Sequence, residues 1–362
     1  MTMARSMMFE SWRGRYADSP RAVSESISQQ HPDIRLDWVI GDPRQLPEQC
    51  TPVKRHSAGY FRKLLSTDYL FTNDIVSKHL VKGPRVTYIQ CWHGTPLKKV
   101  GFDESHPDSR GFASHMRRVV RDVRKWDYLV SPSPTCSDLL RSAFRYEGRI
   151  LETGYPRNDV LNSVQAPRIR EQVRASLGIS PEQLVVLYAP TWRDDSKDES
   201  GHFQDTSTVD YQLMSRSLPP GTVLLNRLHA VVHSKARTWQ DERLTVLDVS
   251  KYPDIADLYL AADVLVSDYS SAIYDFAVTG KPIVLYAYDL TQYSETTRGL
   301  YFDYHLWAPG PIVTTFGQLI EELLRVGDFE IRYAERYRAF RQRFCPLEDG
   351  RATDRLLAAV LG

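Results

Sequence analysis

Short runs of apolar residues recur along the whole chain, and stretches with helical spacing separate them. Such runs are typical of strands whose two faces are both buried in a parallel sheet. In the first half they predict strands at Ser6–Phe9, Leu36–Ile40, Tyr69–Thr72, Val86–Cys91 and Tyr128–Val130. In the second half they predict strands at Leu184–Tyr188, Thr222–Asn226, Leu244–Asp248, Asp263–Val266 and Pro282–Tyr286. Helices predicted between them, such as Pro20–Gln29, make strand and helix alternate, which indicates an α/β protein with two doubly wound sheets.

The chain of 362 residues is longer than one ordinary domain of about 100–200 residues, so two domains are expected. The polar stretch Asn162–Arg168 carries a proline and predicts a boundary that gives domains over residues 1–165 and 166–330. Residues 331–362 are rich in Arg, Ala and Leu and predict a helical tail, for which packing on the first domain is one option. In open α/β sheets ligands bind at the carboxyl ends of the strands, so residues that follow strands are the functional candidates.

Charge and cysteine content narrow the function classes. The chain has 46 basic and 45 acidic residues, so its net charge gives no general attraction to nucleic acid. Its four cysteines lie far apart and show no zinc-binding spacing, which favours free thiols in a reducing compartment. The first residues lack the apolar stretch of a signal peptide, and no apolar run is long enough to span a bilayer. We therefore expect a cytoplasmic protein with, at most, peripheral membrane contact.

The first candidate segment follows the predicted strand Val86–Cys91 and reads Trp-His-Gly-Thr-Pro-Leu-Lys-Lys. It places His93 on a loop at a strand end. Imidazole exchanges a proton near neutral pH, and such loops often carry catalytic residues, so His93 is a candidate general base. Gly94 permits close approach of the backbone. The alternative is a histidine that only stabilises the loop through hydrogen bonds.

Two further strands of the second half also lead into polar side chains. After Leu184–Tyr188, Thr191 and Arg193 offer a hydroxyl and a planar cation suited to phosphate. The alternative for Arg193 is a surface pair with a neighbouring aspartate. Arg227 and His229 follow Thr222–Asn226 and lie two residues apart, so in an extended segment their side chains point to the same side. Together they could neutralise a diphosphate. Their alternative is two unrelated surface residues. The chain contains no Asp-x-Asp triplet, so a metal-free mechanism is the prediction.

The most specific segment is the apolar run that ends at Ser267 and is followed by Asp-Tyr-Ser-Ser. Ser270 and Ser271 fall where a helix is predicted to begin, and exposed N–H groups at a helix start bind phosphate. The alternative is ordinary helix capping, which explains one serine better than two. Upstream, Tyr252 and Asp254 open another predicted helix, where a contact to the nucleobase and ribose is as well supported as simple capping.

One stretch bears on location. Residues 111–125 place several arginines beside apolar residues at helical spacing, which predicts a basic amphipathic helix. Such helices can lie on anionic membrane surfaces. The alternative is a helix that packs on the core and exposes its basic face to solvent.

Taken together, these segments resemble the CDP-glycerol glycerophosphotransferase family, the primases and polymerases of wall teichoic acid and related capsules. The matching stretches, in order along nearly the whole chain, are Phe9–Pro20, Trp92–Asp103, Ala189–Asp195, Arg227–His229, Tyr252–Phe276, Tyr286–Leu290 and Arg298–Tyr304. The resemblance implies a GT-B-like fold, in which two doubly wound Rossmann-type domains face a central cleft. It implies CDP-glycerol as donor, with no tightly bound metal or other cofactor. It also implies a lipid-linked polymer acceptor at the cytoplasmic membrane surface, with residues 111–125 on the membrane side.

The resemblance also assigns roles to individual residues. The catalytic candidates are His93, Arg227 and His229. The donor and phosphate candidates, on the second domain, are Thr191, Trp192, Arg193, Tyr252, Asp254, Ser270, Ser271 and Asp275. The acceptor-side candidates, on the first domain, are Glu10, Ser11, Gly94, Thr95 and Lys98. One departure concerns the turn after His229, where the family often has proline and this chain has Ala230.

The implied reaction is attack of an acceptor hydroxyl on the β-phosphorus of CDP-glycerol, with CMP as leaving group and His93 as base. Three alternatives stay open from the sequence: a GT-B glycosyltransferase that uses a CMP- or UDP-sugar, a ribitol-phosphate transferase that uses CDP-ribitol, and a non-enzymatic nucleotide sensor or scaffold. Primase and polymerase cannot be separated from these residues, because both would share one donor site.

Overall fold

The structure is a computed structural model of the chain, and it describes residues 6–76, 81–104, 112–191, 209–228, 239–291, 293 and 299–362. By its internal contacts the chain divides into two compact units. The first unit consists of Met1–Asn162 together with Phe344–Gly362, and the second consists of Ser163–Arg343. This division lies in the polar stretch in which the sequence predicts a boundary at residues 165 and 166.

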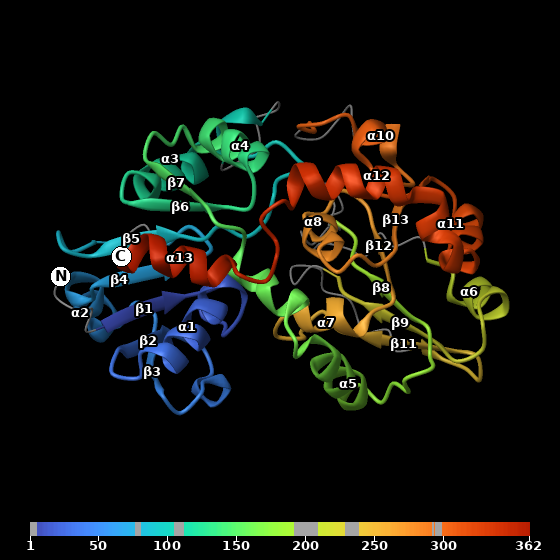
Figure 1. Cartoon of the computed structure of the whole chain (residues 1–362), viewed down its shortest axis with the longest axis horizontal. Helices are drawn as coiled ribbons and strands as arrows, with labels where there is room; N and C mark the ends of the chain where they lie inside the picture. The colour runs from blue at the N-terminus through green and yellow to red at the C-terminus, as the bar shows by residue number, and fades with distance from the viewer. Residues whose placement is uncertain are drawn as a thin grey trace. The chain divides into compact units, whose positions relative to one another are not determined.

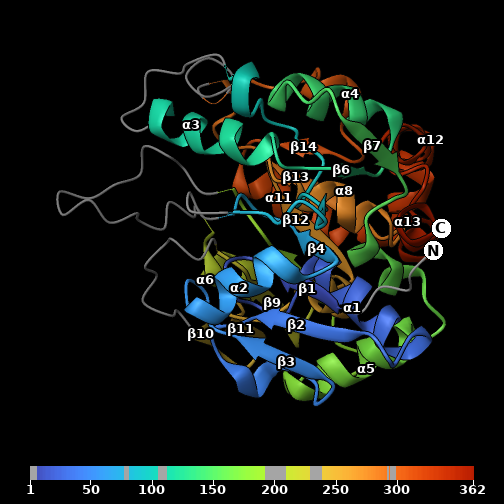
Figure 2. The same cartoon turned by 90° about the vertical axis from the view of Figure 1, so that its left-hand side faces the viewer.

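The first unit is built on a seven-stranded sheet in the order β3-β2-β1-β4-β5-β6-β7, and its strand pairs are all parallel. Its strands β1, β2 and β3 run side by side in Figure 2. The chain moves outward from β1 to β3 and then returns to β4 on the other side of β1. That reversal is the switch point at which ligands bind in open α/β sheets. The strands are β1 (Ser6–Glu10), β2 (Arg35–Val39), β3 (Cys50–Val53), β4 (Tyr69–Thr72), β5 (Thr87–Gln90), β6 (Tyr128–Ser131) and β7 (Arg149–Glu152).

Helices cover both faces of this sheet. Successive side chains of a strand point to opposite faces, and the neighbours Met7 and Met8 accordingly belong to different apolar clusters. Met8 packs on the face that also buries Leu140, and Met7 on the face that buries Ile27 and Leu356. The helices are α1 (Asp18–Gln30), α2 (Ala58–Ser66), α3 (Phe112–Val123), α4 (Pro134–Phe144) and α13 (Ala352–Leu361), with short 3₁₀ turns η1 (Pro43–Gln45), η2 (Gly101–Asp103) and η3 (Pro156–Asn162). Helices α2, α3 and α4 therefore cover one face, and α1 and α13 cover the other.

The predicted helical tail is divided between the two units. Helix α12 (Phe329–Phe344) lies almost entirely in the second unit, where Phe340 stacks on Tyr274 with ring centroids 5.1 Å apart. Helix α13 belongs to the first unit and lies beside α1 (Figure 1). The hydroxyl of Tyr69 donates to the carbonyl of Val360, 3.1 Å away, and so ties α13 to β4. Only the last part of the tail is thus a component of the first unit.

The second unit is also built on a seven-stranded sheet, in the order β10-β11-β9-β8-β12-β13-β14. Its strand pairs are parallel except for the one between β10 and β11. The switch point lies between β8 and β12, since the chain runs outward from β8 through β9 and returns to β12 on its other side. The strands are β8 (Val185–Tyr188), β9 (Thr222–Asn226), β10 (Trp239–Gln240), β11 (Leu244–Asp248), β12 (Val264–Ser267), β13 (Ile283–Tyr286) and β14 (Ile312–Val313).

Helices pack on this second sheet through buried apolar side chains. Met214 and Leu319 join Val186 and Val264 in one apolar cluster. The helices are α5 (Ala166–Ser176), α6 (Tyr211–Ser217), α7 (Ile255–Ala261), α8 (Ala272–Ala277), α10 (Tyr304–Trp307), α11 (Phe316–Leu324) and α12, with the 3₁₀ turn η4 (Val326–Asp328). The ten strands predicted from the sequence are therefore confirmed, with ends that differ by a residue or so, and β3, β7, β10 and β14 are additional. Among the described residues, no helix combines the length and the apolar character needed to cross a membrane.

Candidate active site

The candidate residues of the first unit lie on loops at the carboxyl ends of three neighbouring strands. Ser11 follows β1, Asn73 follows β4, and His93 follows β5. These three strands include the switch point between β1 and β4. Because the carboxyl ends of parallel strands meet at one edge, the fold brings the three loops together. We call the loops 11–16, 73–75 and 91–97 the first-unit edge.

His93 is half-buried and is held by the loop after β4. Its Nδ1 lies 2.6 Å from the backbone carbonyl oxygen of Asn73. The ring stacks on Trp92 with centroids 4.0 Å apart, and it also contacts Trp12, with centroids 4.8 Å apart. Two aromatic rings and one hydrogen bond therefore restrict the imidazole to one orientation.

The backbone around this histidine is strained. Trp12, Arg13, Asp18 and Trp92 have positive φ angles of 46°, 60°, 64° and 51°, in a region that residues with a Cβ atom rarely adopt. Gly94, with φ 153°, supplies the freedom that follows the histidine. Strain of this kind costs on the order of 1–3 kcal/mol for each residue and tends to gather at functional sites.

Side chains join the three loops of the first-unit edge. The amide nitrogen of Trp12 donates to Oδ1 of Asn73, 3.0 Å away. Gln90 accepts from the amide nitrogen of Trp92 at 2.9 Å and donates to the carbonyl of Asp74 at 3.2 Å. Arg13 pairs with the carboxylate of Asp74 at 3.0 Å. Each loop is thus hydrogen-bonded to the loop beside it.

Two buried polar groups of this edge have no partner within the described residues. They are the hydroxyl of Ser11 and the side-chain nitrogen Nδ2 of Asn73. Both residues are fully buried. A buried polar group without a hydrogen bond costs about 1–3 kcal/mol. Asn73 was not among the residues picked from the sequence, although it directly follows a predicted strand, and that position was the signal that could have found it.

Of the remaining acceptor-side candidates, Glu10 has its hydrogen-bond partners within the first unit. The buried carboxylate of Glu10 accepts from Nε of Arg55 at 2.7 Å and from the hydroxyl of Tyr60 at 2.9 Å. Burial, and then the charge of Glu10, raise the pKa of the Tyr60 hydroxyl. Thr95 is buried, and Lys98 is half-buried. Glu10 is therefore committed to the interior of the first unit by two strong contacts.

In the second unit, the loops after β8 and β12 meet at Asp268. Its Oδ1 accepts from the amide nitrogens of Thr191 and Tyr269, at 2.7 and 2.6 Å. The hydroxyl of Ser267 donates to the carbonyl of Ala189 at 2.7 Å. Because β8 and β12 flank the switch point of the second sheet, Thr191 lies where ligands bind in such folds.

The two tandem serines differ in what their hydroxyls do. The hydroxyl of Ser270 accepts from the amide nitrogen of Ala272 at 3.2 Å, as in helix capping. Ser271 precedes α8 and its side chain makes no capping hydrogen bond. Asp275 lies buried within α8. Capping thus accounts for one serine, as the alternative interpretation of the sequence allowed.

Arg227 and Asp254 both organise the loop after β11. The guanidinium of Arg227 donates through Nη1 to the carbonyls of Val249 and Tyr252, at 3.0 and 3.1 Å. Asp254 caps α7 by accepting from the amide nitrogen of Ala256 at 3.1 Å. Capping is therefore observed at Asp254, and Arg227 bridges the ends of β9 and β11. Contacts of these residues with a donor stay predictions.

Three candidates lie outside the described residues: Trp192, Arg193 and His229. Among the residues that are described, no group of three or more His, Cys, Asp or Glu side chains is placed to hold a metal ion. The metal-free mechanism stays a prediction.

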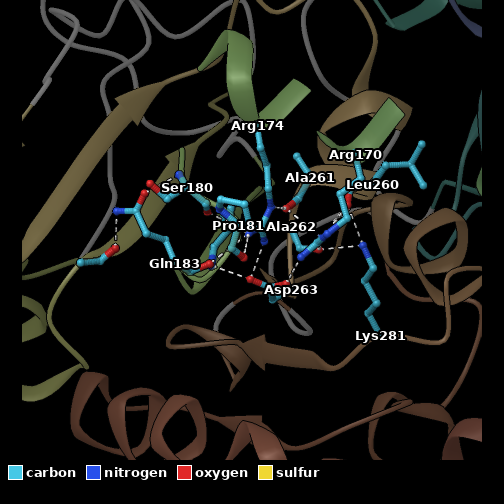
Figure 3. A network of polar contacts seen from close by, with 12 residues as sticks. Arg170, Arg174, Ser180, Pro181, Gln183, Leu260, Ala261, Ala262, Asp263 and Lys281 are labelled. Carbon is cyan, nitrogen blue, oxygen red and sulfur yellow. Dashed lines mark hydrogen bonds and ion pairs between the residues drawn. The ribbon is translucent and has the colours of Figure 1, made fainter. Parts of the chain in front are cut away.

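The opposite, amino edge of the second sheet carries a different cluster, built around Asp263 (Figure 3). We call it the Asp263 cluster; it consists of Arg170, Arg174, Asp263 and Lys281 with the carbonyls they bind. The carboxylate of Asp263 pairs with Arg170 and, at 2.7 Å, with Arg174, and accepts from the amide nitrogen of Val185 at 2.8 Å. Lys281 donates to three carbonyls at the end of α7, at 2.7–3.0 Å. Cations at a helix C-terminus are stabilising, which indicates a structural clamp.

Comparison with known proteins identifies the family of this chain. The family model for CDP-glycerol:poly(glycerophosphate) glycerophosphotransferase matches residues 2–362. The chain belongs to this family. It is 37% identical over 360 residues to the teichoic acid glycerol-phosphate transferase of Staphylococcus aureus (strain NCTC 8325 / PS 47), covering 97% of this chain and 92% of that protein.

Other members of the glycerophosphotransferase family are longer. The teichoic acid poly(glycerol phosphate) polymerase of Bacillus subtilis (strain 168) is 30% identical over 362 residues, which cover 98% of this chain but 48% of that protein. A solved structure of a variant of the wall teichoic acid polymerase TagF, soaked with CDPG, matches with a TM-score of 0.89 and 33% identity, over 98% of this chain and 88% of that chain. The family, the GT-B-like α/β fold class and the class of enzyme expected from the sequence are confirmed.

Proposed function

We propose that this glycerophosphotransferase moves glycerol phosphate from CDP-glycerol to a hydroxyl of a lipid-linked glycopolymer and releases CMP. The observation that carries the proposal is the restrained imidazole of His93 at the first-unit edge, in a chain that matches its family from end to end. Relatives named for glycerol-phosphate transfer cover nearly all of this chain.

The reaction is an in-line displacement at phosphorus. The acceptor oxygen forms a bond to the β-phosphorus of CDP-glycerol, the bond from that phosphorus to the CMP oxygen breaks, and the acceptor proton passes to His93. Phosphoryl transfer depends on positioning and on stabilising charge more than on covalent catalysis. Hydroxyl and cationic groups at the carboxyl edge of the second sheet supply that stabilisation. Among the described residues they comprise Thr191, Arg227 and Ser271. Arg193 and His229, which lie outside the described residues, are candidates from the sequence for further cationic contacts, and Trp192 is a candidate for contact with the donor.

The test is transfer of radiolabelled glycerol phosphate to a defined lipid-linked acceptor, with CMP release and product mass as readouts. His93→Ala is expected to lower kcat by about 10²–10⁴-fold, because a positioned base contributes that much, while affinity for CDP-glycerol changes little. His31→Ala is the matched control, since it removes another half-buried histidine of the same unit, at the end of α1. Near-normal turnover by His93→Ala would remove it as the base. Transfer from CDP-ribitol or from a nucleotide sugar, but not from CDP-glycerol, would reassign the donor.

We further propose that α3 brings the protein to the inner face of the cell membrane. The helix exposes Arg117, Arg118 and Arg121, and Arg124 directly after it is also exposed. Its apolar side chains, among them Val119, are buried in the core of the first unit, so attraction to lipid headgroups has to be electrostatic. A basic residue near an anionic surface contributes about 1 kcal/mol. Replacing the four arginines by glutamine should abolish cosedimentation with phosphatidylglycerol vesicles at low salt; unchanged binding would refute the role of α3.

A further inference from the structure

The hydrogen bond between His93 and the loop after β4 fixes where the imidazole carries its proton. The backbone oxygen of Asn73 lies 2.6 Å from Nδ1. A carbonyl oxygen can only accept, so Nδ1 must be the donor and must hold a proton. In the neutral ring, the second nitrogen, Nε2, then has the lone pair and is the basic atom.

We infer that Asn73 is the positioning residue of His93: it holds the ring in the Nδ1–H tautomer, so that Nε2 takes the proton of the acceptor hydroxyl. That the proton comes from an acceptor hydroxyl rests on the proposed function. The tautomer itself does not, because it follows from the contacts of the chain alone.

The side chain of Asn73 keeps its own backbone oxygen in place. Its Oδ1 accepts from the amide nitrogen of Trp12 at 3.0 Å. A rotated amide would turn Nδ2 towards that N–H group and bring two donors face to face, so the orientation is determined by the contact. Within the described residues Nδ2 has no partner, and the amide is therefore held through Oδ1.

The same contact also places an aromatic ring against the histidine. The amide nitrogen of Trp12 donates to Asn73, and the indole ring of Trp12 contacts the imidazole of His93, with ring centroids 4.8 Å apart. Loss of the Asn73 side chain would therefore loosen two restraints on His93 at once: the acceptor for Nδ1 and the indole. Trp92, which also stacks on the ring, is held separately through a hydrogen bond from its amide nitrogen to Gln90. Asn73 thus connects the loop after β1 and the loop after β4 to the imidazole of His93 in the loop after β5, and the three loops together orient the ring.

The first measurement is the tautomer, read from ¹⁵N chemical shifts of histidine-labelled protein at alkaline pH, where imidazole is neutral. Comparison with His93→Ala identifies the signals of His93. The wild type is expected to show the Nδ1–H form. Asn73→Ala should shift it to a mixture of both tautomers, and Asn73→Asp, which keeps an oxygen for the Trp12 amide, should restore the Nδ1–H form.

The second measurement is kinetic. Asn73→Ala should lower kcat by about 10–100-fold, as loss of a group that orients a catalytic histidine does, with KM for CDP-glycerol changed less than about threefold. Asn162→Ala is the matched structural control, since it also removes a side-chain hydrogen bond within the first unit, to the carbonyl of Glu348 at 2.9 Å. That variant should keep both kcat and the tautomer.

The inference is overturned by an Nε2–H tautomer in the wild type, or by an unchanged tautomer in a folded Asn73→Ala variant. It is also overturned if Asn73→Asp loses the tautomer. If Asn73→Ala does not fold, the wild type and Asn73→Asp still decide the question. A wild type that shows the Nδ1–H form but transfers no glycerol phosphate would refute the proposed function and leave the positioning by Asn73 intact.

Discussion

The polar groups of the first-unit edge and those of the Asp263 cluster differ in how completely they are hydrogen-bonded. At the first-unit edge, the hydroxyl of Ser11 and Nδ2 of Asn73 are buried without a partner among the described residues, and four neighbouring residues have positive φ angles. In the Asp263 cluster, a carboxylate meets two guanidinium groups and a backbone amide, and Lys281 meets three carbonyls. The first-unit edge thus has a strained backbone and polar groups without hydrogen-bond partners, whereas the polar groups of the Asp263 cluster make many hydrogen bonds and ion pairs.

From this difference we infer that the first-unit edge serves chemistry and that the Asp263 cluster serves stability. Unsatisfied groups and strained backbone each cost on the order of 1–3 kcal/mol, so they persist where function requires them and the rest of the fold compensates. The Asp263 cluster joins the start of β12 to α5, and Lys281 joins the start of β13 to the end of α7. It lies at the amino edge of its sheet, away from the strand ends that carry the candidate residues. Perturbed polar groups are therefore informative only together with their place in the fold.

Removal of Asp263 is expected to have the largest effect on stability. In Asp263→Ala the buried guanidinium of Arg174 would lose its partly exposed carboxylate partner, and leaving a buried donor without one of its partners costs about 1–3 kcal/mol. Chemical denaturation should show this loss, while kcat of the folded fraction changes less than about threefold. His93→Ala should show the reverse pattern, with a large loss of kcat and little change in stability.

A matched control for the clamp is the exposed pair of Asp42 and Arg44. Surface pairs contribute little, so Asp42→Ala should leave the denaturation midpoint within experimental error. If Asp263→Ala were as stable as Asp42→Ala but lost activity, the Asp263 cluster would belong to the reaction, and the distinction between the two regions would be wrong.

Most of the fold could be predicted from the sequence, because the central strands of both sheets are continuous apolar runs. The four strands that escaped prediction, β3, β7, β10 and β14, are the four edges of the two sheets. An edge strand pairs on one side only and needs no continuous apolar run. β3, for example, exposes Thr51 and Pro52, and β7 exposes Arg149 and Glu152. The pattern that identifies a strand buried on both faces is absent from these four.

The site was predicted less completely, for a reason that lies in the backbone. His93 was selected as a candidate because it follows a strand in a distinctive motif. Asn73 acts through a backbone carbonyl, and which carbonyl reaches an imidazole depends on loop conformation that no residue pattern specifies. Arg227 was expected to face phosphate, and the structure shows its guanidinium on two loop carbonyls, a contact that likewise depends on the fold of a neighbouring loop.

The two tandem serines allow the same contrast, between a group that stabilises the fold and a group that binds the donor, to be tested at adjacent residues. Ser270→Ala should destabilise the protein by about 1 kcal/mol, because its hydroxyl caps α8. Ser271→Ala should instead weaken binding of CDP-glycerol about 10–100-fold, since a hydrogen bond to a charged phosphate contributes about 1.5–3 kcal/mol. Calorimetric titration and thermal unfolding of both variants give the two readouts. Equal donor affinity in wild type and Ser271→Ala would remove that serine from the phosphate site.

The smallest expected effect is a pH dependence of the Asp263 cluster. Burial, and then the charge of Arg170, lower the pKa of Lys281 from its ordinary value of 10.5 to about 7. Above that value the folded protein binds fewer protons at Lys281 than the unfolded chain, so its contribution to stability rises with pH and is lost as pH falls through about 7. Between pH 7 and 8 the gain is about 1 kcal/mol, calculated from the linkage relation. The difference in free energy of unfolding between wild type and Lys281→Met should therefore increase across this interval. A constant difference would mean that the three carbonyls keep Lys281 charged at both pH values, and the Asp263 cluster would then be a fixed clamp without a titrating member.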